Sequence, residues 1–155
     1  MKSRALVLGT VVCLVVGVAA GHAKTTKTVK VDCARGDSIN EALGAKGDEL
    51  IVEISGMCHE NVLIERSFVT LKGADPGSDG VVGLPPAGPD VSGLAVVKIL
   101  RADSVRLENL TVQGGANHGI LAGWGDPLEI VNCHVVDNAR FGITSWFGSH
   151  VFCTG

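Results

Sequence analysis

Short apolar runs alternate with turn-forming residues along most of this chain. The runs are rich in Val, Ile and Leu: "ELIVEIS", "NVLIE", "FVTLKG", "AVVKIL", "VRLENLTV" and "LEIVNCHVV". Gly, Asn, Asp and Ser separate them, which is typical of β-strands joined by tight turns. Strands this short are not stable alone or in a single hairpin. The pattern therefore predicts an all-β protein whose short strands stack on one another.

Two segments repeat with a period of 23 residues. Residues 103–125, "DSVRLENLTVQGGANHGILAGWG", align without a gap on residues 126–148, "DPLEIVNCHVVDNARFGITSWFG". A period of this length, made of short strands and Gly turns, is typical of a parallel β-helix, a solenoid whose stacked coils bury one apolar column. Residues 23 apart should then lie above one another at about 4.8 Å. The pairs that agree in character are Asp103 with Asp126, Val105 with Leu128, Leu107 with Ile130, Asn109 with Asn132, Gly119 with Gly142, Ile120 with Ile143 and Trp124 with Phe147.

The repeat weakens toward the N-terminus. Residues 67–73 form a partial copy, in which Val69 and Leu71 correspond to Val105 and Leu107. Residues 74–93, which follow, are rich in Gly, Pro and Asp. We therefore expect a loop there, inserted at a turn of one coil.

Residues 24–48 have a different pattern. Residues 24–32, "KTTKTVKVD", partly alternate polar with apolar and predict a strand. Ser38 and Glu41 have the spacing of a capping box, and Gly44 is a typical stop. One short helix, begun at Ser38, is therefore expected in an otherwise β-structured chain.

Residues 1–23 have the three parts of a secretory signal peptide. A basic start with Lys2 and Arg4 precedes an apolar run from Ala5 to Ala20. Small residues allow cleavage after Ala23, with cleavage after Ala20 as a second option. The alternative is a transmembrane anchor, but the run is short and no strongly basic flank follows it. We expect a secreted or periplasmic protein that has no membrane segment after cleavage.

Charge argues against a nucleic-acid partner. Cleavage removes two of the 13 Lys and Arg residues and none of the 16 acids, so the remaining chain carries a net charge of −5. Phosphate binding needs clustered basic residues, which this balance does not offer. The four cysteines beyond residue 23 allow three disulfide pairings, and export permits disulfides.

Four stretches together resemble a known superfamily: "VDCARGDSINEAL", "ELIVEISGMCHENVLIERSFVTLKG", "NLTVQGGANHGI" and "NCHVVDNARFGI". They are similar to the secreted bacterial right-handed parallel β-helix proteins of the pectate-lyase-like superfamily. The resemblance implies a right-handed coil over residues 49–155, closed at its N-terminal end by the strand and capping helix of residues 24–48. It also implies a disulfide between Cys33 and Cys58, which ties this cap to the first coil.

Two stacked carboxylates are the candidates for a metal. Asp103 and Asp126 lie one period apart, and a calcium-dependent polysaccharide lyase needs acidic oxygen ligands. Calcium takes about six to eight oxygens, however, and no further acid joins this column. Asp before Ser or Pro is also a common start of a turn. We predict no cofactor, with calcium at Asp103 and Asp126 as the alternative.

Aromatic residues are the candidates for a ligand. Trp124 should lie above Phe147, with Trp146 beside them, and aromatic faces suit the apolar faces of sugars. The alternative is an aromatic stack that packs at a corner of the coil. The histidines show no metal pattern, because Phe141, not a histidine, lies one period after His118.

Two structural pairs are expected elsewhere in the repeat. Asn109 over Asn132 predicts an amide ladder along the turns. Arg106 over Glu129 predicts an ion pair on the outside of the solenoid.

Two functional hypotheses remain. The first is a non-catalytic exported protein that presents an elongated surface to polysaccharide or to a cell-envelope partner. The second is part of a polysaccharide lyase or glycoside hydrolase that acts on acidic glycans, with catalytic coils outside this chain. In the 23-residue register Gly155 falls at the turn position of Asn132 and Asn109. We therefore expect a C-terminally truncated solenoid that self-associates through its last coil.

Overall fold

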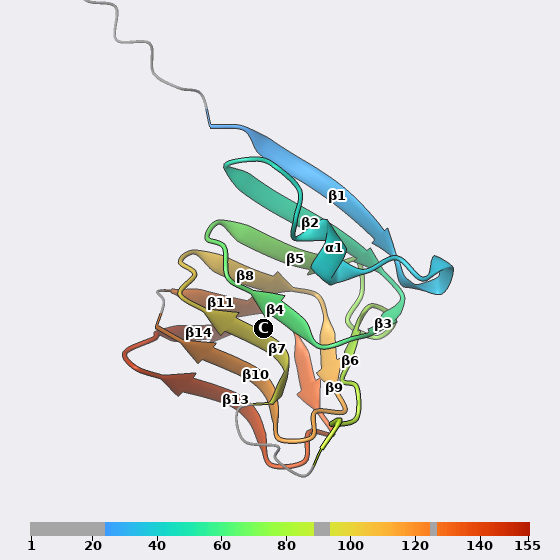
Figure 1. Ribbon diagram of the computed structural model, residues 1–155, viewed down its shortest axis with the longest axis vertical. Coiled ribbons are helices and arrows are strands. Elements are labelled where there is room, and N and C mark those ends of the chain that lie inside the picture. Colours follow the sequence, from blue (N-terminus) through green and yellow to red (C-terminus); the bar gives the residue numbers. More distant parts are fainter. Residues whose placement is uncertain (1–23, 89–93, 125–126) are drawn as a thin grey trace, which may run out of the picture.

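The computed structural model describes residues 24–88, 94–124 and 127–155, and within them it shows a parallel β-solenoid (Figure 1). Its strands form three parallel sheets. Sheet A has the order β1-β2-β5-β8-β11-β14, sheet B the order β12-β9-β6-β3, and sheet C the order β13-β10-β7-β4. Each coil of the chain contributes one strand to each sheet in turn, which is the architecture of a β-helix.

The strands are short, as the sequence predicts. They are β1 (Thr26–Asp32), β2 (Glu49–Ser55), β3 (Met57–His59), β4 (Val62–Ile64), β5 (Val69–Gly73), β6 (Gly80–Val82), β7 (Ala95–Leu100), β8 (Val105–Glu108), β9 (Thr111–Gln113), β10 (His118–Gly123), β11 (Leu128–Val131), β12 (His134–Val136), β13 (Phe141–Trp146) and β14 (Val151–Thr154).

The predicted 23-residue register is confirmed between coils. Val105 pairs with Leu128 in sheet A, and Ile120 pairs with Ile143 in sheet C. The partial copy is also placed correctly, since Val69 pairs with Val105. The step from Val69 to Val105 is 36 residues, 13 more than the period, because extra residues lie both before and after β6.

The prediction that residues 74–93 form a loop is wrong in part. They contain β6, which lies between β3 and β9 in sheet B. Val81 is fully buried and stands in register between Cys58 and Val112. Glycine is needed before it, because a Cβ on Gly80 would lie 2.1 Å from the Thr111 carbonyl oxygen. Without a strand in this coil, sheet B would leave the core position between Cys58 and Val112 empty. Residues 89–93 of the predicted loop lie outside the described part of the chain.

Stacked aliphatic side chains form the core. Val52, Leu71, Leu107 and Ile130 follow one another in register across sheet A, and each is at most 4 % exposed. A fully buried side chain of this kind stabilises the fold by about 1.5–3 kcal/mol. The column is thus continuous through the coils and holds the three sheets together.

The N-terminal strand belongs to the solenoid itself. All seven residues of β1 pair in parallel register with β2, from Thr26 with Glu49 to Asp32 with Ser55. After β1 come a 3₁₀ turn, Cys33–Arg35, and a single helical turn, α1 (Ile39–Ala42). The predicted disulfide between Cys33 and Cys58 is present.

The carboxylate of Glu60 holds α1 against the first coil. It accepts hydrogen bonds from the Ile39 N–H (2.7 Å) and the Ser38 hydroxyl (3.0 Å). Ser38 in turn accepts from the Glu41 N–H, which is the predicted N-cap contact. Ile39 is fully buried in the core. That this segment caps the column remains a prediction.

Residues with a left-handed backbone conformation form corners between the sheets. Asn109 (φ 54°) and Asn132 (φ 47°) follow β8 and β11, and the Asn132 amide donates to the Asn109 side-chain oxygen at 2.8 Å. This confirms the amide ladder. On the outside of sheet A, the predicted ion pair of Arg106 with Glu129 is also present, and Glu108 shares it.

The proposed signal peptide, residues 1–23, lies outside the described part of the chain. Within the residues that are described, no helix has the length and apolar character needed to cross a membrane.

Candidate functional site

Most aromatic side chains of the protein lie in one connected cluster beside sheet C. The chain has four Phe and two Trp residues, and four of these six join a continuous series of ring contacts with His118. We call this series the aromatic ridge. In order along it, its members are Phe141, His118, Trp146, Phe147 and Trp124.

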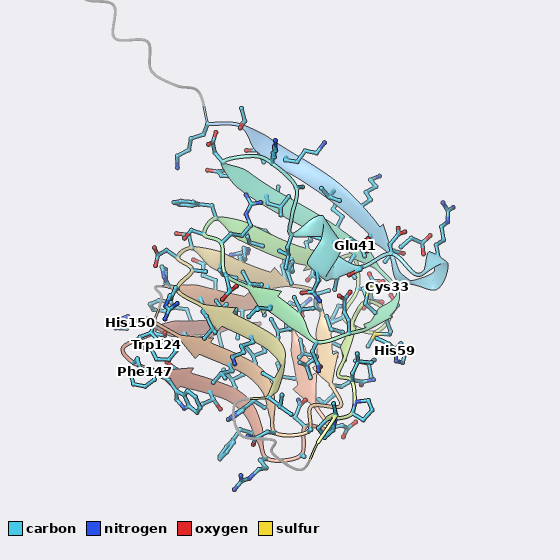
Figure 2. The ribbon with its side chains drawn as sticks, in the orientation of Figure 1. Cys33, Glu41, His59, Trp124, Phe147 and His150 are labelled. Atoms are coloured by element: carbon cyan, nitrogen blue, oxygen red, sulfur yellow. A yellow bond between two sulfur atoms is a disulfide. The ribbon has the colours of Figure 1, made fainter. Side chains whose placement is uncertain are left out.

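The corner after sheet C supplies one end of the ridge. Arg101, Trp124 and Phe147 follow β7, β10 and β13 one coil apart, and all three have φ of 53°. The ring centroids of Trp124 and Phe147 are 4.3 Å apart with planes 7° from parallel. The Arg101 guanidinium lies 5.9 Å from the Trp124 ring centroid. Figure 2 shows Trp124 and Phe147 together at the margin of the molecule.

The two rings of this ladder differ in exposure. Arg101 lies one coil before Trp124 and Phe147 one coil after it, so the indole has a neighbour on each side along the stack. Phe147 is 66 % exposed and Trp124 49 %. Phe147 therefore offers a ligand more of its ring than Trp124 does.

Sheet C supplies the rest of the ridge. His118 on β10 pairs in register with Phe141 on β13, and their rings stack at 5.3 Å with planes 17° apart. Trp146, at the end of β13, meets His118 edge-on at 5.8 Å and Phe147 edge-on at 6.4 Å. Trp146 and Phe147, together with Ser145, line an open depression of ≈ 460 Å³.

A cation lies at each end of the ridge. The Arg140 guanidinium is 5.8 Å from the Phe141 ring centroid, and Arg101 takes the corresponding position over Trp124. Both arginines are exposed. A guanidinium over an aromatic face contributes about 0.5–1 kcal/mol at exposed sites, and its N–H groups can still bind an anion.

His118 is the buried member of the ridge. It is 3 % exposed, and its Nδ1 is hydrogen-bonded to the Thr144 hydroxyl at 2.8 Å. Burial, and secondarily the charge of Arg140, lower the pKa of His118 below 6.5. Both effects favour the neutral form of the imidazole.

The structure brings together all three predicted ligand residues, Trp124, Trp146 and Phe147. Their role in binding a ligand remains a prediction. Sequence reasoning missed four partners: Arg101, His118, Arg140 and Phe141. The 23-residue period could have indicated two of these partners. Arg101 lies one period before Trp124, and His118 lies one period before Phe141.

The predicted metal pair is described only in part. Asp103 is exposed, and its backbone N–H donates to the Ser67 hydroxyl at 2.9 Å. Asp126 lies outside the described residues. Across residues 24–88, 94–124 and 127–155, no three His, Cys, Asp or Glu side chains come together as a metal site. Calcium at Asp103 and Asp126 remains a prediction.

One buried acid that the sequence did not single out has a structural role. Asp79 is 5 % exposed and accepts hydrogen bonds from the backbone N–H groups of Gly56 and Ala74 (both 2.8 Å) and of Asp75 (3.1 Å). Burial alone would raise the pKa of Asp79, but these N–H groups lower it below 3.8. Its oxygens bind the backbone of two coils, so we assign Asp79 to stability.

Comparison with known proteins gives no further assignment. A scan against protein-family models, a search of curated proteins and a search of solved structures each found no match to this chain.

Proposed function

We propose that this protein is an exported, non-catalytic carbohydrate-binding solenoid that contacts polysaccharide through the aromatic ridge. The observation that carries the proposal is the chain of ring contacts from Phe141 to Trp124. Four of its rings are 41–66 % exposed and rest on strands of one sheet. Exposed rings on a rigid support are the usual means of binding the C–H faces of sugars.

The arginines favour an acidic glycan. Guanidinium groups bind carboxylates and sulfates through paired N–H donors, and Arg101 and Arg140 lie at opposite ends of the ridge. An extended saccharide along the ridge could place ring faces on Phe147 and Trp146 and acid groups at the ends. A cell-envelope component with the same chemistry would satisfy the site equally well.

The disulfide supports export. Disulfides persist in oxidising compartments, and the Cys33–Cys58 bond fits the signal peptide proposed for residues 1–23. We therefore propose a secreted or periplasmic protein. A right-handed coil, a capping role for residues 24–48 and kinship with the pectate-lyase-like superfamily complete the proposal, and they rest on the sequence resemblance.

Binding to a panel of glycans tests the function. Residues 24–155 are titrated with neutral and acidic polysaccharides by calorimetry, with calcium and with a chelator. We expect an acidic glycan to bind and Phe147→Ala to weaken it roughly tenfold, the loss of one well-placed aromatic contact. Phe68→Ala is the matched control, because Phe68 is also an exposed corner residue of positive φ but lies outside the ridge.

The same samples test the enzyme hypothesis. Products are assayed for new reducing ends and for unsaturated sugars, the signatures of a hydrolase and a lyase. Turnover above the buffer blank would replace the non-catalytic proposal with the enzyme. Equal weakening by the Phe68 and Phe147 variants would reject the ridge as the binding site.

A further inference from the structure

His118 occupies a central position in the aromatic ridge. It is the only ridge residue that is buried, at 3 % exposure, while Trp146 is 41 % and Phe141 50 % exposed. Its ring stacks on Phe141 and meets the edge of Trp146, and its Nδ1 is fixed by Thr144. One side chain on β10 therefore contacts two exposed rings on β13.

The surroundings of His118 are unfavourable for a second ring proton. The positive charge of Arg140, which precedes Phe141, repels a positive imidazolium. On the described strands of sheet C, the other charged side chain is that of Lys98 on β7, in register with Leu121. These strands carry no carboxylate, so an imidazolium there has no acid from its own sheet to pair with.

We propose that His118 is the positioning residue of the aromatic ridge: the neutral ring holds Phe141 and Trp146 in place for the ligand, and protonation releases them. Ligand binding then weakens as the pH falls. The ligand part of this inference rests on the proposed function. The coupling between the imidazole and the rings does not, and it can be measured on the free protein.

Tryptophan emission of the free protein tests the coupling. The protein has two tryptophans, Trp124 and Trp146, and both belong to the ridge. Emission is followed from about pH 8 to about pH 4, across and below the ordinary range of histidine. We expect a transition in the wild-type protein that is absent in His118→Asn, whose amide can still reach Thr144 but does not titrate.

Two further variants make the result decisive. His134→Asn removes an exposed histidine outside the ridge and should keep the wild-type transition. If His118→Asn does not give the native far-UV spectrum, His118→Gln takes its place. A wild-type protein without a transition, or one whose transition persists after His118 is replaced, would overturn the proposal.

The effect of His118 on ligand binding is tested with the glycan that binds best in the panel. Wild-type affinity should fall about tenfold from about pH 8 to about pH 5, the change that one full pKa unit of coupling produces. His118→Asn should bind with the same affinity at both pH values, about five- to tenfold more weakly than the wild type at the higher pH. Wild-type affinity that does not change with pH overturns the ligand part. If no glycan binds, the proposed function fails, while the emission titration still decides the role of His118.

Discussion

The indole of Trp124 stacks on the phenyl ring of Phe147, 4.3 Å away and 7° from parallel. The two residues follow β10 and β13 at the same corner of successive coils. This contact joins coils through side chains, in addition to the backbone hydrogen bonds of sheet C. It also restrains each ring against the other, and such support is what a binding surface needs.

The stacked pair should be energetically coupled. Trp124→Ala and Phe147→Ala each remove one ring, and the double variant removes both. Urea unfolding of the cycle should give a coupling energy of about 0.5–1.5 kcal/mol, the usual value for aromatic pairs. A coupling energy near zero would mean that the two rings do not contact each other in solution.

Acid should destabilise the protein through Asp79. A folded-state pKa below 3.8 means that the unfolded chain binds the proton more tightly, so stability is present above about pH 4 and is lost as the pH falls. Asp79→Asn should cost about 1–3 kcal/mol at neutral pH, because its amide cannot accept from three N–H groups. Urea unfolding at several pH values measures both effects.

The exposed Asp137 provides the control for Asp79. It lies at a corner with φ of 52°, a conformation that asparagine also tolerates. Asp137→Asn should leave the unfolding free energy within about 0.5 kcal/mol of the wild type. Equal effects of both substitutions would remove the special role that we assign to Asp79.

Breaking the disulfide should loosen the N-terminal coil. Cys33 and Cys58 are 25 positions apart, and closing a loop of this size stabilises a fold by about 2–4 kcal/mol. Cys33→Ser with Cys58→Ser should lower the melting temperature and increase hydrogen exchange in β1 and α1. Exchange in β10 and β13 should stay unchanged, and a uniform increase along the chain would contradict this local role.

The sequence predicts the aromatic ridge only where residues one period apart are both aromatic. Trp124 and Phe147 are both aromatic, so a 23-residue alignment pairs them. His118 and Phe141 occupy the same kind of paired position, but a histidine above a phenylalanine does not look like a repeat. The two rings can stack only if both side chains project from the same face of sheet C. The spacing of residues in the sequence does not show which face that is.

Insertions hid two other features. Arg101 lies one period before Trp124, but the extra residues on either side of β6 interrupt the repeat before β7. The strand β6 was missed because Gly80–Val82 is short and lies among Gly, Pro and Asp. Only the neighbouring coils, which leave a core position for Val81 between Cys58 and Val112, require a strand there.

The last described coil should mediate self-association. Among the described residues, ten large hydrophobic side chains are exposed, and six of them come from this coil: Val136, Phe141, Ile143, Trp146, Phe147 and Phe152. A cavity of ≈ 320 Å³ lies at this coil, and its lining includes Ile130, Val135, Ile143 and Cys153. The edges of β12, β13 and β14 can pair with strands of a second copy, whose last coil offers strands at the same three positions. Residues 133–155 carry one acid and one arginine, so two copies would not repel strongly.

A charge placed at this end should prevent the association. Ile143→Lys places an ammonium group beside the cavity, where a second copy would bury it, and the variant should shift toward monomer in sedimentation velocity at increasing concentration. Leu63→Lys is the control, because Leu63 is exposed on β4 in the first coil and lies outside the edge. A wild-type chain that stays monomeric throughout, or a Leu63 variant that dissociates equally well, would contradict association through this coil.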